Sequence, residues 1–271
     1  MTLAWNRLFF KNMIRVCVLF AAGINCDEET AYAFELAGAC PETVHINRLK
    51  KKPALLRNYQ IFVIPGGFSY GDYIASGRVL ANEIKHNLSE EIERFLAEGK
   101  LILGICNGFQ VLVKSGLLPA LEKPFEPQRV TLDTNDSARY EDRWVYLRTE
   151  TTPCVFTRNL PEIVYLPVAH SEGKFIVDTP ETLRQLNARG QIVLRYVNAR
   201  GERAGYPDNP NGSVEGIAGI CDPTGRIFGL MPHPERYTRR EHHPRWHREN
   251  LTKPDGIVIF ENAVNYVQEN L

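Results

Sequence analysis

The chain has 271 residues, a length that suits one large α/β domain or two small ones. Hydrophobic residues make up 44% and charged residues 24%, which are ordinary globular values and argue against disorder. The 32 basic and 32 acidic side chains cancel, so the chain has no overall basic field for nucleic acid. The apolar runs reach about six to eight residues, well short of a membrane span. Six cysteines without CxxC spacing favour a reducing compartment, and we expect a cytoplasmic protein that binds neither nucleic acid nor membrane.

The first predicted strand is Met13–Phe20, whose nearly continuous apolar run is typical of a strand buried on both faces of a parallel sheet. Residues 1–12 lack the apolar core and cleavage site of a signal peptide. We interpret them as an N-terminal extension, with translation starting at Met1 or Met13. Three further strands are predicted at Thr43–Ile46, Gln60–Ile64 and Leu101–Ile105.

Helical periodicity separates these strands. Asp27 can cap a helix that buries Phe34, Gly99 ends a helix with an apolar face, and Gly116 ends the helix after Leu101–Ile105. Strands that alternate with helices at short spacing predict a doubly wound, mostly parallel sheet with helices on both faces.

Residues 120–160 break this alternation. They are rich in turn formers, and only Trp144–Leu147 has strand character, so we predict an irregular excursion from the sheet. Strand-like runs resume at Ile163–Ala169, Lys174–Val177, Ile192–Val197, Glu215–Ile220 and Ile227–Met231, and a final helix closes the chain. Without repeats or a low-complexity linker, residues 13–271 are predicted to form a single domain.

The stretch LILGICNGFQ, residues 101–110, is the most informative one for chemistry. It places Cys106 between two glycines at a strand-to-helix junction, which is the cysteine version of a nucleophile elbow. A helix N-terminus favours a thiolate, and the amide of Asn107 is free to donate to an oxyanion. The alternative is a buried structural cysteine. Cys26 also follows a strand and is a rival nucleophile, but it lacks the flanking glycines.

A thiol nucleophile needs a base and a group that orients the base. The run ending at Met231 is followed by Pro232-His233-Pro234-Glu235. The carboxyl ends of parallel strands share one edge of a sheet, so His233 and Glu235 should lie near Cys106. The alternative is a rigid surface turn.

Other candidates are weaker. Pro65–Asp72 contains glycines that could point amides at an anion, but no nucleotide-binding signature occurs, so an oxyanion loop is favoured over a phosphate loop or a plain turn. His170 follows a strand and could face the same crevice. His242, His243 and His247 lack a clear fourth ligand, and we predict no metal site.

Taken together, these motifs resemble class I glutamine amidotransferases, in which a Cys–His–Glu triad matches Cys106, His233 and Glu235. The chain is most similar to the subfamily of amidotransferase subunits of phosphoribosylformylglycinamidine synthases, in de novo purine biosynthesis. The stretches that carry the resemblance are AAGINCDEET, PGGFSYGDYIASG, GICNGFQVL, NDSARYEDRWVYLR and MPHPER. A cysteine-elbow thiol hydrolase, a glutaminase of another pathway and a catalytically inactive regulatory subunit are the alternatives.

The resemblance implies a flavodoxin-like architecture and a glutaminase that passes ammonia to a synthetase subunit, often through a small bridging subunit. That synthetase would use ATP and Mg²⁺ to convert formylglycinamide ribonucleotide to formylglycinamidine ribonucleotide, and this chain would need no cofactor. The expected oxyanion- or glutamine-binding residues are Gly66, Gly67, Phe68, Asn107, Gln110 and His170.

Overall fold

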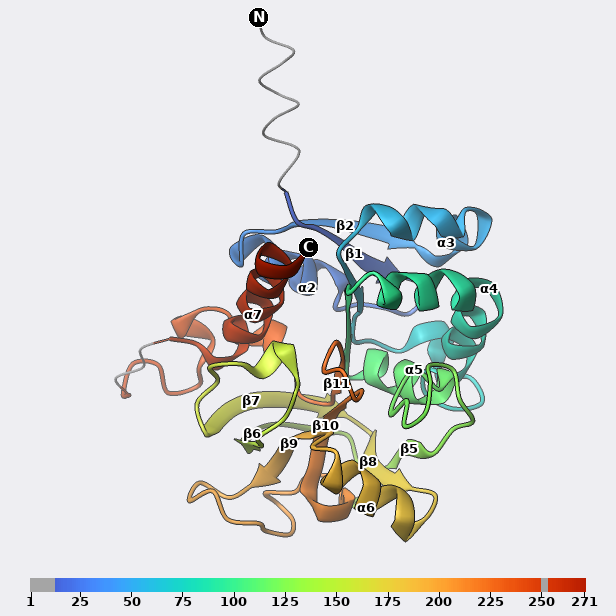
Figure 1. Cartoon of the computed structure of the whole chain (residues 1–271). Helices are drawn as coiled ribbons and strands as arrows, with labels where there is room; N and C mark the ends of the chain where they lie inside the picture. The colour runs from blue at the N-terminus through green and yellow to red at the C-terminus, as the bar shows by residue number, and fades with distance from the viewer. Residues whose placement is uncertain (1–12, 250–252) are drawn as a thin grey trace, which may run out of the picture.

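The computed structural model describes residues 13–249 and 253–271, and this part of the chain contains a nine-stranded sheet in the order β2-β1-β3-β4-β11-β10-β9-β6-β7 (Figure 1). In the described residues, β2, β1, β3, β4 and β11 are parallel, whereas β10, β9, β6 and β7 are antiparallel to their neighbours. The parallel strands are β2 (Cys40–His45), β1 (Arg15–Phe20), β3 (Ile61–Ile64), β4 (Leu101–Ile105) and β11 (Ile227–Leu230). The others are β10 (Ile217–Cys221), β9 (Ile192–Val197), β6 (Glu141–Thr149) and β7 (Ile163–His170). The predicted N-terminal extension, residues 1–12, lies outside the described residues.

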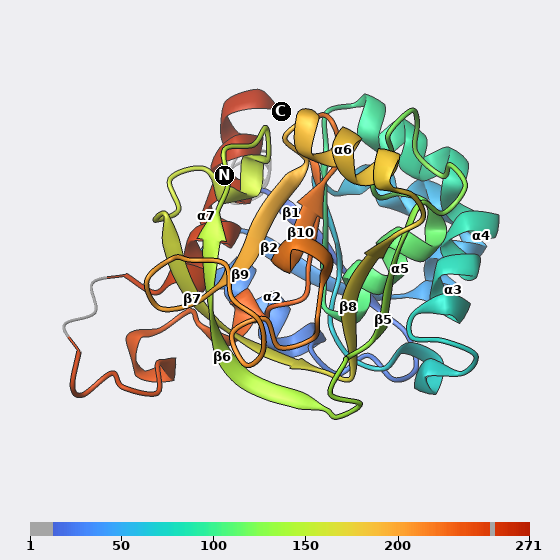
Figure 2. The ribbon, with the colours of Figure 1, turned by 90° about the horizontal axis from the view of Figure 1, so that it is seen from below.

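Helices cover both faces of the parallel strands. In Figure 1, α2 (Asp27–Leu36) and α7 (Asp255–Asn270) lie on one side, and α4 (Arg78–Ala97) and α5 (Asn107–Ser115) lie on the other. The rings of Phe34 and Phe260 pack edge to face at 4.9 Å and join α2 to α7. Figure 2 shows the molecule from below, with α6 (Pro180–Ala188) near one end of the ribbon formed by β5 (Val130–Thr134) and β8 (Glu172–Val177). The predicted doubly wound α/β class is therefore confirmed.

Burial explains why most of the parallel strands were predicted close to their observed bounds. The exception, predicted at Thr43–Ile46, is β2, which has a single buried residue and ends before Ile46. Every residue of β3, β4 and β11 is buried, so these strands are apolar throughout. Asp27 is the first residue of α2 rather than its cap, which is Cys26. Two short helices, α3 (Ile46–Lys51) and α6, were not predicted. Among residues 13–249 and 253–271, no helix combines the length and apolar character needed to cross a membrane.

The prediction of an irregular excursion over residues 120–160 was wrong in two respects. It missed β5, which pairs with β8 in a two-stranded ribbon, and it placed the strand at Trp144–Leu147 outside the sheet. The segment contains β6, which is part of the main sheet and pairs with β7 from Glu141 to Arg148 and with β9 from Tyr146 to Thr149. Its burial alternates, with Val145 and Leu147 buried and their neighbours partly exposed. A strand with one polar face carries a much weaker apolar signal than a strand buried on both faces.

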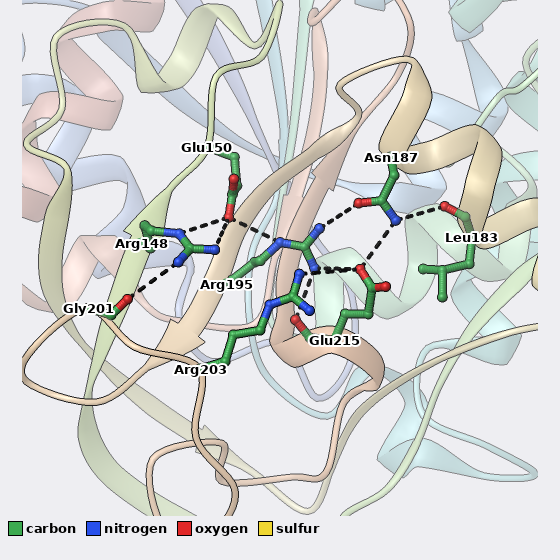
Figure 3. Close-up of polar contacts among 8 residues, drawn as sticks. All are labelled: Arg148, Glu150, Leu183, Asn187, Arg195, Gly201, Arg203 and Glu215. Atoms are coloured by element: carbon green, nitrogen blue, oxygen red, sulfur yellow. Dashed lines mark hydrogen bonds and ion pairs between the residues drawn. The ribbon is translucent and has the colours of Figure 1, made fainter.

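A charged network ties the antiparallel strands together (Figure 3). Arg195 of β9 is only 4% exposed. Its Nε lies 3.1 Å from Glu150 Oε1, and its Nη1 lies 3.0 Å from Glu215 Oε2. Its Nη2 donates to Asn187 Oδ1 at 2.8 Å. Arg148 and Arg203 contact the same two carboxylates from more exposed positions.

We expect Arg195→Met to lower the free energy of unfolding by about 2 kcal/mol, because two carboxylates lose their buried partner but keep an exposed one. Urea denaturation measures this change. Arg184→Ala removes the exposed Arg184–Glu181 pair and is the control, with an unchanged midpoint. Equal midpoints for both variants would contradict a structural role for the network.

Candidate active site

Cys106 lies on a strained turn between β4 and α5. Its backbone has φ 50° and ψ −105°, a conformation that residues other than glycine rarely adopt. The flanking glycines are sterically required: a Cβ on Gly108 would lie 1.8 Å from the carbonyl oxygen of Ile64, and one on Gly104 would lie 2.7 Å from the carbonyl oxygen of Gly108. The residue is 6% exposed, and its Sγ lies 3.7 Å from the carbonyl oxygen of Ala169. The sequence therefore builds the elbow that was predicted from it.

This strain has a measurable cost. Such a conformation costs about 1–3 kcal/mol in a non-glycine residue, whereas the extra freedom of glycine in the unfolded chain costs about 0.5–1 kcal/mol. We expect Cys106→Gly to be about 1 kcal/mol more stable than Cys106→Ala in urea denaturation. At the helical position Ala31, replacement by glycine should instead destabilise by about 1 kcal/mol. A Cys106→Gly variant less stable than Cys106→Ala would contradict strain at the elbow.

The order of strands in the sheet places His233 and Glu235 near the elbow. Strand β11 runs parallel to β4 with Leu230 opposite Ile105, so the segments after the two strands leave at the same edge. The amide of His233 donates to the carbonyl of Pro167 at 2.8 Å, which fixes the backbone. Its Nδ1 lies 2.6 Å from Glu235 Oε1, and both side chains are almost fully buried. Glu235 thus orients the imidazole through Nδ1.

Two opposed effects determine the protonation of His233. Burial lowers its pKa, but the charge of Glu235 raises it, and Cys106 and Cys26 add to that effect. The net result is a pKa well above the usual histidine value. We infer that His233 can carry a proton at neutral pH, as an acid that serves a leaving group must.

Gly66 lies against both His233 and Cys106. A Cβ at this position would lie 2.9 Å from His233 Cε1 and 3.5 Å from Cys106 Cβ. Gly67 has φ 141°, and a Cβ there would lie 2.8 Å from the backbone of residues 23–25. Gly66 therefore allows the backbone to approach the reacting groups closely, as an oxyanion loop requires, and Gly67 allows the same loop to pack against the segment after β1.

Phe68 is not placed as an oxyanion donor. Its amide donates to the carbonyl of Gly23 at 2.8 Å, and its side chain is 43% exposed. The remaining candidate oxyanion donors are the backbone amides of Gly67 and Asn107. Asn107 is the first residue of α5, so its amide has no acceptor within the helix.

The side chains of Asn107 and Gln110 brace the elbow. Asn107 Oδ1 accepts from the amide of Ser69 at 3.1 Å, and its Nδ2 donates to Gln110 Oε1 at 2.8 Å. Gln110 Nε2 donates to the carbonyl of Glu172 at 2.6 Å. These amides join the loop after β3 and the start of β8 to the nucleophile.

His170 is held in place rather than free to face a substrate. Its Nδ1 lies 3.1 Å from Asn135 Oδ1, and its ring lies against Gly173, where a Cβ would be 2.4 Å from Cε1. Burial lowers its pKa to about 3, with a further contribution from His233. It is therefore neutral and anchors Asn135, which sequence reasoning missed even though the stretch NDSARYEDRWVYLR contains it.

The structure adds Cys26, Glu29 and Arg236 to the neighbourhood of the triad. Arg236 Nη2 donates to Cys26 Sγ at 3.3 Å, and its Nε donates to Glu29 Oε1 at 3.0 Å. A Cβ on Gly66 would be 3.1 Å from Cys26 Sγ. Burial raises the pKa of Cys26, and the nearby His233 opposes that effect. All three residues lie in the stretches AAGINCDEET and MPHPER, which carried the family resemblance.

The histidines after Tyr237 have partners other than the triad residues. His243 packs among Trp144, Tyr165 and Tyr237, with ring centroids about 5.5 Å apart. His242 Nδ1 accepts from the amide of Thr238 at 3.4 Å. Within the described part of the chain, these histidines do not gather into a group of potential metal ligands.

Comparison with known proteins identifies the family of the chain. Residues 13–267 match the model of the CobB/CobQ-like glutamine amidotransferase domain. A protein of Dehalococcoides mccartyi named phosphoribosylformylglycinamidine synthase subunit PurQ is 49% identical over 94% of this chain and 98% of the relative. The PurQ subunit of Archaeoglobus fulgidus is 43% identical over 94% and 98%. The structure of PurLQS from Thermotoga maritima aligns with a TM-score of 0.71 and 32% identity, over 94% of this chain and 99% of that one. The chain belongs to the CobB/CobQ-like glutamine amidotransferase family and, within it, to the PurQ subunits.

Proposed function

We propose that this chain is the glutaminase subunit of a phosphoribosylformylglycinamidine synthase. It hydrolyses L-glutamine through a cysteine thioester and delivers ammonia to a synthetase subunit. The observation that carries the proposal is the strained Cys106 beside the buried His233–Glu235 pair, in a chain 49% identical to a PurQ subunit. We further propose that residues 13–271 act as one unit in the cytoplasm.

The first half of the reaction forms the thioester. The Cys106 thiolate attacks the side-chain amide carbon of glutamine, and the amides of Gly67 and Asn107 stabilise the oxyanion. His233 donates a proton to the leaving nitrogen as the carbon–nitrogen bond breaks, which releases ammonia. Glu235 holds the imidazole in the orientation that this transfer needs.

The second half regenerates the enzyme. Neutral His233 removes a proton from a water molecule, whose oxygen attacks the thioester carbon. The tetrahedral intermediate collapses, the carbon–sulfur bond breaks, and glutamate leaves. The proton stays on His233, which returns the thiolate–imidazolium pair.

The partner performs the nucleotide chemistry in this proposal. A synthetase subunit uses ATP and Mg²⁺ and the delivered ammonia to convert formylglycinamide ribonucleotide to formylglycinamidine ribonucleotide, and a small bridging subunit joins the two. The structure of PurLQS from Thermotoga maritima supports a three-component assembly. The loop beside the elbow supports it too: Asp72 Oδ1 accepts from Asn107 Nδ2 at 3.2 Å, while the next side chains, Tyr73 and Ile74, are strongly exposed.

The test is glutamate release by this chain with and without its synthetase partner, in the presence of ATP and formylglycinamide ribonucleotide. The partner is first shown to be active on ammonium salt. We expect slow hydrolysis by the chain alone and a large rise with the partner, matched by amination. A fast uncoupled rate would contradict control by the partner. No release with a competent partner would contradict the proposed function.

A further inference from the structure

Four potential metal ligands, one of which is the base of the triad, lie in a single cluster. Cys26 and Glu29 come from the start of α2, and His233 and Glu235 come from the segment after β11. One ligand atom of each lies within 4.8 Å of the others. The proposed mechanism uses only His233 and Glu235 of this group.

Two atoms in this cluster have no hydrogen-bond partner among the described residues, His233 Nε2 and Glu235 Oε2. Both side chains are at least nine-tenths buried. Burying a polar atom without a partner costs about 1–3 kcal/mol, so each atom is available to a ligand that enters the cluster. Cys26 is itself 1% exposed, which places a sulfur donor beside them.

The donor set favours a zinc-class ion. Thiolate, imidazole and carboxylate are the usual zinc ligands, and tetrahedral coordination places sulfur and nitrogen about 3.6 Å apart. The ligand atoms of Cys26 and His233 lie within 4.8 Å of each other, so binding requires them to approach by at most about 1.2 Å. The contact between Glu235 Oε1 and His233 Nδ1 is also the arrangement that orients zinc-binding histidines, with a carboxylate on one ring nitrogen and the metal on the other.

Arg236 occupies the outer side of the same cluster. Its guanidinium donates to both Cys26 Sγ and Glu29 Oε1, the two atoms that a cation would take. Its side chain is about one-third exposed and can turn toward solvent. A surface pocket of about 350 Å³, lined by Glu29, Glu235 and Arg236, provides a route of approach.

We propose that Cys26, Glu29 and His233 form a binding site for a zinc-class divalent cation, with Arg236 as its competitor. Binding places the ion on His233 Nε2, the atom that exchanges protons with substrate. This inference rests on the proposed function. Zinc bound at this site inhibits the glutaminase reaction and leaves amination from free ammonia unaffected.

Binding is measured first, on the full chain alone, with Co²⁺ as a spectroscopic probe that Zn²⁺ then displaces. A thiolate-to-cobalt charge-transfer band is expected in the wild-type chain and in Cys106→Ala. Cys26→Ser should lose the band, and Glu29→Gln should weaken binding by about tenfold or more. Cys40→Ser, which removes an exposed thiol, is the matched control and should keep the band. Circular dichroism verifies that each variant is folded.

Removing the competitor gives an opposite result. Arg236→Ala should bind Co²⁺ about tenfold more tightly, because the ion no longer displaces a guanidinium. No band in the wild-type chain, a band that survives in Cys26→Ser, or one that depends on Cys40 or Cys106 would overturn the site. A band with weaker binding in Arg236→Ala would overturn the role of Arg236.

Inhibition is measured second, on the assembled synthetase. Zn²⁺ should suppress glutamine-dependent amination, and the concentration needed should rise at least about tenfold in Cys26→Ser. Ammonia-dependent amination is the internal control. Binding at Cys26 without inhibition would overturn the placement of the ion on His233 Nε2. Absence of glutamine-dependent amination before zinc is added would instead contradict the proposed function, so the two failures are distinguishable.

Discussion

Replacing Cys106 with alanine is expected to lower glutamine-dependent amination by at least about 10⁴-fold and to leave ammonia-dependent amination by the assembled enzyme unchanged. The loss is large because no other group within the proposed mechanism forms the thioester, and removing one member of a catalytic unit costs nearly as much as removing all of it. Alanine keeps the Cβ of the elbow, so the backbone strain and the fold should persist. Steady-state kinetics with glutamine and with ammonium salt measure the two rates.

Cys26→Ala is the matched comparison, because Cys26 is a buried thiol in contact with the same histidine. It should retain glutamine use and thioester formation. The thioester can be trapped on the wild-type chain with labelled glutamine and detected by mass spectrometry. Label on Cys26, or wild-type glutamine use by Cys106→Ala, would show that Cys106 is the wrong nucleophile.

Replacing Glu235 with glutamine is expected to lower glutamine-dependent kcat/KM by about 10²- to 10⁴-fold, because the orienting carboxylate on His233 Nδ1 is lost. Glu29→Gln is the control. It removes a carboxylate from the same cluster, but one that bonds Arg236 rather than the histidine. Equal losses in the two variants would indicate a general effect of charge rather than the contact at Nδ1.

The pH profile gives Glu235→Gln a second readout. Burial lowers the pKa of His233 and the Glu235 carboxylate raises it, so removing the carboxylate leaves burial unopposed. The protonated histidine is then lost at a lower pH. We expect the alkaline limb of kcat/KM to move to lower pH, and a shift in the opposite direction would contradict this account of the pair.

The sequence predicted the strands that are buried throughout, parallel β4 and antiparallel β9 among them, better than the strands with an exposed face, such as β2 and β6. Strands such as β4 are buried on both faces, so their boundaries coincide with apolar runs. Strand β6 has one polar face, and its partners β7 and β9 follow it in the chain, so neither burial nor neighbouring elements marked it as part of the sheet. Pairing between distant segments does not appear in a local pattern.

The candidate site was also predicted only in part. Cys106, His233 and Glu235 could be predicted because each follows an apolar strand, and strand ends converge in a parallel sheet. The direction of an amide or a ring could not be predicted. Phe68 lies in the predicted loop, but its amide donates to the carbonyl of Gly23. His170 lies at a strand end, but its ring is hydrogen-bonded to the side chain of Asn135. Those outcomes depend on contacts with segments far away in sequence.

The position of β11 beside β4 determines when during synthesis the thiol can become reactive. Cys106 is made well before its base, because 126 residues separate Cys106 from His233 in the sequence. A ribosome therefore exposes a chain with the elbow but without the imidazole for several seconds at about 5–20 residues per second. Until β11 is inserted between β4 and β10, we expect the nascent chain to release no ammonia, and a fragment that ends before His233 should be inert. Completion of the fold thus works as the last check on a reaction that would waste glutamine if it began early.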